Sequence, residues 1–504
     1  MEKTEIRLQY SGFVIFAARM ISVATGMIFT LLITRNTTQE QYGIWSNVFD
    51  LIAYFAILAA AIPFWTTRFV ARGKEGAAKT GFIANLVIAL ISVSLYMPLV
   101  PLFISLFNIS SSYLIVYLIA SMHIIELYLI NVLEAVLRAT KPQTVGYGLL
   151  IEEIFKVLLA YVLIVMFQQP LLGAMGGLIT GFSIQIIYYT NLASKDFKQK
   201  IQWNYLKEWV KGSIANIYYL VGNQIAVFIL ILLFMYGGSQ VGPVARANYQ
   251  AAVTIANIVM YSSLLSFALY PKLLTEKNLE DVTTSLKTVL MFAIPMAAGA
   301  MAIPDSFLTM LDETYRQASP ILILLAIDAL VATISQFYIF VVFGVEKFDE
   351  EAKIPLKQLA KSHIFKVFTL PYVHSMITLP TAFYVLSNFA VNQPVQAAMY
   401  VTIINMTARF LMFLILYLIV RKTVLISIPW KSISKYVFAS AIMAVILHVI
   451  PHPTRIITTL SVAVVGGILY LILLMAIDKE ARELVKAILQ EIRNIVDKLA
   501  VIFP

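Results

Sequence analysis

Three basic side chains stand inside long apolar stretches of the sequence: Arg19, Lys156 and Arg409. A charge at the centre of a bilayer costs about 2.5 to 3.5 kcal/mol on insertion scales, so such a residue faces a hydrated cavity or a partner. A guanidinium meets phosphate oxygens through two parallel hydrogen bonds, and an ammonium supplies a point charge. We therefore predict that these residues line a cationic cavity that receives a phosphate or pyrophosphate group.

Carboxylates near Lys156 offer a second interpretation of that residue. Glu152 and Glu153 precede it by four and three residues, which is one helical turn. Glu126, on the preceding apolar run, is at a depth of about 18 Å, and Lys156 is at about 15 Å, for a rise of 1.5 Å per residue. Lys156 is thus either a cavity base or one member of an ion pair that joins two helices.

Arg19 and Arg409 differ in the partners that the sequence offers them. Arg19 has no acidic residue at matching depth on its own run or the next, which favours the cavity. Arg409 follows Asn405 and lies opposite Asp328 of another run, which favours a packing pair with that carboxylate.

Intramembrane carboxylates also bind coupling ions in transporters. His123, Glu126 and Glu134 lie within about 80° on one helical face. We predict Na⁺ or H⁺ as a coupling ion and no other cofactor. The candidate residues for ion coupling or ion pairing are Asp50, Glu126, Glu152, Glu153 and Asp328.

Four side-chain amides lie near the middle of the chain, and such amides can form hydrogen bonds with the hydroxyl groups of a sugar. They are Asn216, Asn223, Gln224 and Asn257. The same amides are also common as hydrogen-bonding contacts between transmembrane helices, so both roles stay open.

Elements that hold such residues must be long apolar helices. Of the 504 residues 60% are hydrophobic and 13% are charged, and the mean hydropathy is +0.84. This composition excludes a soluble multidomain enzyme and a disordered chain, and the absence of Cys excludes a disulfide framework and thiolate metal sites. We predict an all-α polytopic membrane protein.

About 20 apolar residues span a hydrocarbon core of about 30 Å. Fourteen runs of suitable length are present. They lie at 12–34, 44–67, 81–106, 113–137, 146–167, 170–192, 212–235, 248–270, 286–310, 319–344, 368–391, 395–420, 433–450 and 456–477.

The distribution of charge predicts the orientation. With a cytoplasmic N-terminus, 30 of the 37 Lys and Arg residues lie on the cytoplasmic side and four on the other. This asymmetry is the positive-inside pattern, and it explains the net charge of +10 better than nucleic-acid binding does. We predict a multi-pass protein of the plasma membrane with both termini in the cytoplasm.

Weak internal similarity predicts two halves. Residues 39–43 have a counterpart at 240–242, and the segment from Pro101 resembles that from Pro304, at offsets near 200 residues. The predicted arrangement has two pseudo-symmetric six-helix lobes and two extra C-terminal helices. Its parts are an N-lobe at 1–192, a cytoplasmic linker at 193–211, a C-lobe at 212–420, spans thirteen and fourteen at 421–477, and a cytoplasmic amphipathic helix at 478–504.

A basic first span with Arg19 is followed by the turn at 34–46, TRNTTQEQYGIWS, and a later link runs from Pro304 to Pro320. These features resemble the polysaccharide-transporter (Wzx-like) branch of the multidrug/oligosaccharidyl-lipid/polysaccharide flippase superfamily. The resemblance implies a flippase that moves an undecaprenyl- or dolichyl-linked oligosaccharide across the membrane, with glycan-assembly enzymes as partners and no ATP hydrolysis.

Several alternatives remain open. A cation-coupled drug or metabolite antiporter of the same superfamily is favoured if carboxylates outweigh bases in the cavity. A membrane glycosyltransferase or ligase needs an outer acidic pair, for which Asp305, Asp312 and Glu313 are the candidates; a scaffold needs no polar cavity. The sequence contains no Asp-x-Asp or His-Glu-x-x-His motif, so we predict no metal site and a transporter rather than an enzyme.

Overall fold

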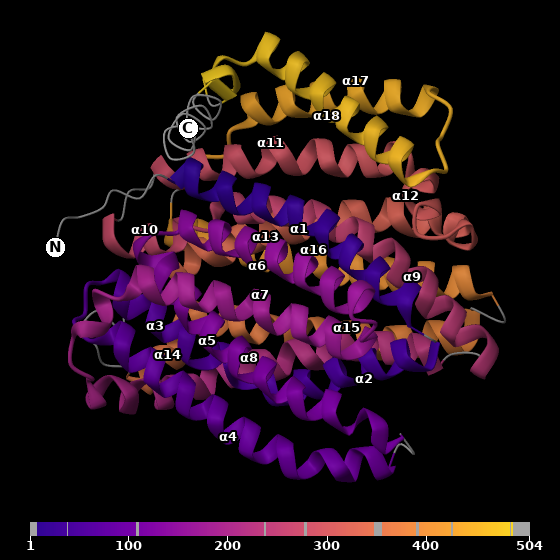
Figure 1. The fold of residues 1–504 in the computed structure, drawn as a ribbon. Coiled ribbons are helices and arrows are strands. Elements are labelled where there is room, and N and C mark those ends of the chain that lie inside the picture. Colours follow the sequence, from indigo (N-terminus) through magenta and orange to yellow (C-terminus); the bar gives the residue numbers. More distant parts are fainter. Residues whose placement is uncertain are drawn as a thin grey trace, which may run out of the picture. The chain divides into compact units, whose positions relative to one another are not determined.

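A computed structural model describes residues 8–37, 39–106, 110–235, 238–276, 280–346, 355–389, 393–424, 427–483 and 485–486. Throughout this part of the chain, every regular element is a helix (Figure 1). The helices form two compact units. Unit 1 comprises residues 1–221, 267–277 and 342–369, and unit 2 comprises residues 222–266, 278–341 and 370–504.

Unit 1 is built from the first half of the chain together with two segments from the second half. Its helices are α1 (Leu8–Asn36), α2 (Gln39–Ala56), α3 (Ala61–Ala71), α4 (Ala77–Leu106), α5 (Leu114–Thr140), α6 (Gln143–Tyr161), α7 (Pro170–Ala193), the start of α8 (Trp203–Met235), α10 (Leu269–Glu276) and α14 (Leu356–Lys361).

Unit 2 holds the remaining helices. They are the end of α8, α9 (Gly238–Met260), α11 (Glu280–Ala302), α12 (Pro304–Thr309), most of α13 (Ser319–Val345), most of α15 (His363–Phe389), α16 (Pro394–Thr423), α17 (Trp430–Val449) and α18 (Ile456–Ile477).

Eleven helical segments of the described chain are long and apolar enough to cross a membrane, so the protein is an all-helical polytopic membrane protein. The predicted total of fourteen spans is not confirmed. Helices also cover the run at 12–34 and most of the runs at 146–167 and 368–391, but they are not among the eleven, and in the first run only Tyr10–Gly26 is found as a shorter apolar helix. In α6, three ionisable residues interrupt the apolar sequence: Glu152, Glu153 and Lys156. Pro371 and Pro380 both lie inside the continuous helix α15.

Aromatic side chains and their hydroxyls organise the core of unit 1. Tyr96 donates a hydrogen bond to the Tyr117 carbonyl at 2.9 Å, and Tyr128 donates to the Phe55 carbonyl at 2.8 Å. Asn85 donates to the Tyr128 carbonyl at 2.6 Å. Buried polar groups are stabilising only when they are bonded in this way, so these contacts fix how α2, α4 and α5 pack.

In unit 2, the two C-terminal helices pack on α11, as the yellow end of the ribbon shows (Figure 1). Tyr470 of α18 donates a hydrogen bond to the Met291 carbonyl of α11 at 2.6 Å. Gly466 lets α18 approach α17, because a Cβ atom at this position would lie 3.0 Å from a methyl group of Leu447. Helices α17 and α18 therefore belong to the packed structure of unit 2.

Part of the predicted amphipathic helix at 478–504 lies outside the described residues. Residues 479–483 are helical, and Asp478 accepts hydrogen bonds from the backbone N–H groups of Glu480 and Ala481 at 2.9 and 3.4 Å. Asp478 thus provides the helix with an N-cap.

Candidate functional site

The densest cluster of buried charge in unit 1 lies on α6. Lys156 Nζ is 2.9 Å from Glu152 Oε1 and 2.9 Å from Glu153 Oε2, and all three residues are buried. The ammonium also lies 5.5 Å from the centre of the Phe29 ring of α1. Lys156 therefore takes part in an ion-pair network with the two neighbouring carboxylates that were predicted, and these pairs lie within α6 rather than between two helices.

Neighbouring helices join this network. Thr25 of α1 donates a hydrogen bond to Glu153 Oε2 at 2.7 Å. Arg19 is exposed on α1, and its charge acts on the carboxylates of Glu152 and of Glu134 on α5. These two carboxylates come from α5 and α6, and the sequence prediction considered only acids on the run that holds Arg19 and on the next run.

A second buried cluster joins α5 and α7 and contains no Lys or Arg in the described chain. His123 Nδ1 is 3.1 Å from Glu126 Oε2, and Ser183 donates to Glu126 Oε1 at 2.8 Å. The rings of Phe182 and Phe49 lie 4.9 and 6.0 Å from the His123 ring, centre to centre. Glu126 is only 5% exposed, so it is a buried carboxylate that contacts an imidazole and a hydroxyl, and it does not pair with Lys156 as one prediction had it.

Glycines bring α7 against the charged face of α6. A Cβ atom at Gly177 would lie 2.9 Å from the Lys156 carbonyl oxygen, and one at Gly181 would lie 2.8 Å from the Glu152 carbonyl oxygen. Gly173 meets the following turn in the same way, at 2.9 Å from Leu163. Three glycines spaced by four residues form a small-residue stripe, which lets two helix backbones approach closely.

A groove of about 390 Å³ runs beside this network. Its lining residues lie on α1 and α6 and just beyond α6, and most of them are apolar. The polar lining groups are Thr25, Glu153 and Tyr161; the apolar ones include Ile28, Leu32 and Leu158. The groove can hold an apolar group next to a carboxylate.

In unit 2, Arg409 Nε lies 2.7 Å from Asp328 Oδ1. Asp328 is buried, and the Arg409 side chain is 34% exposed. The expected packing pair between these residues is thus present, so Arg409 carries a counter-charge of its own.

The predicted sugar-binding amides fall in both units. Asn216 is buried in unit 1 and donates a hydrogen bond to the Ala61 carbonyl at 2.9 Å. Asn223, Gln224 and Asn257 belong to unit 2, where Gln224 and Asn257 are exposed. Asp50 lies on α2, and its side chain is outside the described residues.

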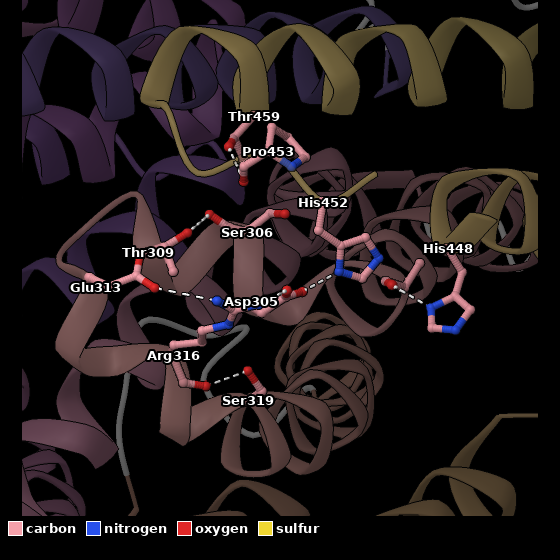
Figure 2. A network of polar contacts seen from close by, with 11 residues as sticks. Asp305, Ser306, Thr309, Glu313, Arg316, Ser319, His448, His452, Pro453 and Thr459 are labelled. Atoms are coloured by element: carbon pink, nitrogen blue, oxygen red, sulfur yellow. Dashed lines mark hydrogen bonds and ion pairs between the residues drawn. The ribbon is translucent and has the colours of Figure 1, made fainter. Parts of the chain in front are cut away.

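The three acidic residues considered for an outer catalytic pair have structural partners, and Figure 2 shows those of Asp305 and Glu313. Asp305 Oδ1 is 2.6 Å from His452 Nδ1, and its other oxygen is 3.8 Å from Arg316 Nη2. Glu313 is 3.4 Å from Arg316 Nη1. Asp312 accepts hydrogen bonds from the N–H and hydroxyl of Thr314, which lower the pKa of its carboxyl group.

The sequence reasoning missed several residues of these clusters. Ser183 and Tyr189 of α7 contact carboxylates of α5: Ser183 bonds to Glu126, and Tyr189 donates to Glu134 at 3.5 Å. Tyr189 also bonds to the Val145 carbonyl at 2.8 Å. The glycine stripe at 173, 177 and 181 indicates only the face of α7 that packs closely on α6, so the sequence contained no signal for these contacts with α5.

The fold is similar to that of solved MATE transporters. A MATE structure in the straight conformation matches with a TM-score of 0.64 at 14% identity, covering 84% of this chain and 99% of that one. An outward-facing multidrug resistance MATE family transporter of the MOP superfamily matches with a TM-score of 0.63 at 14% identity and the same coverage. A MATE structure in complex with MaD3S matches with a TM-score of 0.64 at 12% identity, covering 82% of this chain and 96% of that one.

No protein-family model and no curated protein matches the chain. The solved structures that it resembles are transporters and not enzymes, and they lie in the superfamily that the sequence resemblance indicated. The likeness does not reach the Wzx-like branch.

Proposed function

We propose that the protein is a cation-coupled antiporter that moves an amphipathic organic substrate across the membrane. The single observation that carries this proposal beyond the fold is Glu126, a buried carboxylate whose polar contacts are His123 and Ser183. In the described chain no Lys or Arg forms an ion pair with it. Burial of a charge without a counter-charge costs free energy, and binding of a cation from the solvent would lower this cost for Glu126.

A proton suits this pair better than a metal ion does. A proton can be shared between Glu126 Oε2 and His123 Nδ1, which are 3.1 Å apart. The Ser183 hydroxyl can donate to the carboxylate when the proton leaves. The pair can therefore exist with one proton or with none.

The bases proposed for a phosphate-binding cavity carry counter-charges, which supports the antiporter over the lipid-linked flippase. Lys156 pairs with Glu152 and Glu153, and Arg409 pairs with Asp328. The charge of Arg19 acts on the carboxylates of Glu134 and Glu152. Carboxylates thus outweigh bases around α6.

The proposed cycle is alternating access with Na⁺ or H⁺ moving against the substrate. The groove between α1 and α6 supplies apolar walls, which suit the apolar part of an amphipathic substrate. Protonation of Glu126 would reduce the negative charge of unit 1 and so weaken its attraction for a cationic substrate, which couples the two ligands in opposite directions.

The flippase for a polyprenyl- or dolichyl-linked oligosaccharide stays as a second candidate because of one observation. Arg19 is exposed on α1, the helix that also lines the apolar groove. A guanidinium and an apolar groove on one helix suit a phosphate attached to a lipid tail.

Reconstitution into proteoliposomes tests the two functions together. A pH gradient is imposed, and the release of a fluorescent organic cation is compared with the movement of a labelled polyprenyl-pyrophosphate oligosaccharide. We expect dye movement that depends on the gradient and stops when a protonophore collapses it.

Oligosaccharide movement without any dye transport would reject the antiporter and favour the flippase. Dye movement driven by a Na⁺ gradient at equal pH would keep the antiporter and replace H⁺ by Na⁺. Vesicles that contain the Glu126→Gln variant provide the matched control for residual leakage.

A further inference from the structure

A pocket of about 280 Å³ lies in unit 2, away from the clusters described above. It is bounded by α13, by the last turns of α16 and by the link from α16 to α17. Its polar lining residues are Tyr338, Tyr417, Arg421 and Ser427, and the rest of the lining is aliphatic. The lining contains no carboxylate, so the pocket offers hydrogen-bond donors and one positive charge.

Arg421 is the charged member of this lining. It is exposed, and it makes no ion pair or hydrogen bond within the described part of the chain. Its neighbours in the wall are fixed: Tyr338 is 4% exposed, and its ring lies 6.2 Å from Tyr417 and 6.0 Å from Phe413, centre to centre. A guanidinium beside rigid phenol rings and a serine hydroxyl is suited to phosphate oxygens.

The surface that leads to the pocket is apolar. Leu411, Leu414 and Leu418 are all exposed, and their spacing of three and four residues continues to Arg421, so the four share one face of α16. Trp430, the first residue of α17, is also exposed. An apolar stripe that ends at a basic residue, with Trp nearby, is typical of the boundary between acyl chains and headgroups.

We propose that this pocket binds the phosphate-bearing headgroup of an anionic phospholipid, with an acyl chain along the leucine stripe of α16. Arg421 forms the charge-assisted hydrogen bonds to the phosphate, and the hydroxyls of Ser427 and the tyrosines bond to its remaining oxygens or to a headgroup alcohol. Basic pockets between transmembrane helices on the cytoplasmic side recognise anionic lipids by this chemistry.

Charges around the pocket agree with an anionic ligand. Lys422 and Lys431 are exposed on either side of the link. The C-terminal carbonyl groups of α16 repel an anion, so the attraction depends on the side chain of Arg421 rather than on the helix end.

The test is lipid binding by the intact protein in detergent, which requires no transport. The delipidated protein is titrated with phosphatidylglycerol, with phosphatidylcholine and with inorganic phosphate, and binding is followed by native mass spectrometry and by thermal unfolding. Arg421→Gln removes the proposed contact. Lys422→Gln is the matched control, because it removes the adjacent exposed charge and leaves the pocket lining intact.

We expect phosphatidylglycerol to bind the wild-type protein more tightly than phosphatidylcholine does. Arg421→Gln should weaken phosphatidylglycerol binding by about tenfold or more, as loss of a charge-assisted hydrogen bond predicts. Arg421→Lys should keep part of the affinity, and Tyr417→Phe should lower it with no change in net charge.

Three results would overturn the proposal. Equal losses in Arg421→Gln and Lys422→Gln would mean that the surface attracts anionic lipids without a site. Binding of inorganic phosphate that competes with the lipid at equal strength would identify the ligand as a soluble phosphate. Equal affinity for phosphatidylglycerol and phosphatidylcholine would show that the pocket does not recognise the negative charge of the headgroup.

Discussion

The buried pair of Glu126 and His123 determines what a single proton can do in unit 1. Replacement of Glu126 by Gln keeps the shape of the side chain and its contact with Ser183, which is 2.8 Å from the carboxylate. We expect transport driven by a pH gradient to fall to the rate of empty vesicles, while the free energy of unfolding changes by about 1 kcal/mol or less. Dye release from proteoliposomes and thermal unfolding measure the two effects.

A matched control is Glu208→Gln. Glu208 pairs with Lys211 at 2.8 Å, and the Lys211 side chain is 43% exposed, so this substitution removes a carboxylate from a partly exposed pair. Transport by the Glu126→Gln variant at the wild-type rate would show that Glu126 does not couple the proton to transport.

Lys156 makes the opposite kind of contribution, because its removal leaves two buried carboxylates without their ammonium. Lys156→Ala should lower the free energy of unfolding by about 3 to 5 kcal/mol, the usual cost of breaking a buried ion pair from one side. A triple variant with Lys156→Met, Glu152→Gln and Glu153→Gln should lose much less, since no charge stays buried alone. Thermal unfolding in detergent compares the two, and equal losses would mean that Lys156 contributes through packing alone.

The residue pairs that sequence could predict were those set by local spacing or by depth. Glu152 and Glu153 lie one turn from Lys156, and Asp328 and Arg409 were matched by their positions in two apolar runs. Contacts that depend on which helices pack against each other could not be predicted from the sequence. Ser183 reaches Glu126 from α7 for this reason, and the charge of Arg19 reaches Glu134 across α1 and α5.

At the scale of elements, the glycine stripe of α7 determines how closely α6 is held. Gly177→Ala and Gly181→Ala each place a methyl group within 2.9 Å of a carbonyl oxygen of α6, so the two helices must separate. We expect each variant to lose about 1 to 3 kcal/mol of stability, as overpacking usually costs. Thermal unfolding of the purified variants measures the loss.

Gly176 provides the control on the same helix. A Cβ atom there meets only the end of the flexible Leu163 side chain, at 3.0 Å. Gly176→Ala should be neutral or stabilising by up to about 1 kcal/mol, because Ala is the better helix former. If all three variants behaved alike, close packing of α6 on α7 would not be what the glycines provide.

Two arginines of α3 cap the C-terminus of helix α13. Arg68, which is fully buried, donates to the carbonyls of Phe343 and Glu346, the latter at 2.8 Å. Arg72 donates to the Glu346 carbonyl at 2.6 Å. The last carbonyls of a helix have no partner inside it, so these guanidinium groups satisfy them.

Arg68→Met keeps the length of the side chain and removes the donors. We expect a loss of about 3 kcal/mol in stability, because two buried carbonyls lose bonds to a charged donor. Arg72→Met should cost less, since Arg68 still bonds to Glu346. Chemical unfolding of the two variants ranks them, and the reverse order would contradict the assignment of Arg68 as the main cap.

Hydropathy predicted where most of the helices lie, and the bounds agree closely for α7, α13, α16, α17 and α18. They differ by up to ten residues for α9, and the run predicted at 44–67 is divided between α2 and α3. Hydropathy does not explain how helix α6 can be buried, because its sequence contains three ionisable residues. These residues neutralise one another at a spacing of one helical turn. Composition alone does not report this compensation.

At the scale of the whole molecule, the parallel repeat predicted two halves, and the described chain divides into two compact units. The units are not consecutive in sequence, because residues 267–277 and 342–369 belong with unit 1. Sequence similarity between halves cannot reveal such an exchange, since it depends on where the ends of α10, α13 and α15 pack. The boundaries of the proposed lobes, at 192 and 420, stay a prediction.

The orientation of the protein in the membrane is predicted from the excess of Lys and Arg on one side, and the absence of Cys from the sequence makes the prediction directly testable. Glu75 and Glu313 are exposed on predicted opposite sides, so a single cysteine at either site is the only thiol in the chain. We expect Glu313→Cys to react with an impermeant maleimide in intact cells, and Glu75→Cys to react only after permeabilisation. The reversed pattern would place the lysine-rich side outside. It would also move the proposed lipid pocket to the other leaflet and invert the direction in which Glu126 would couple a proton to its substrate.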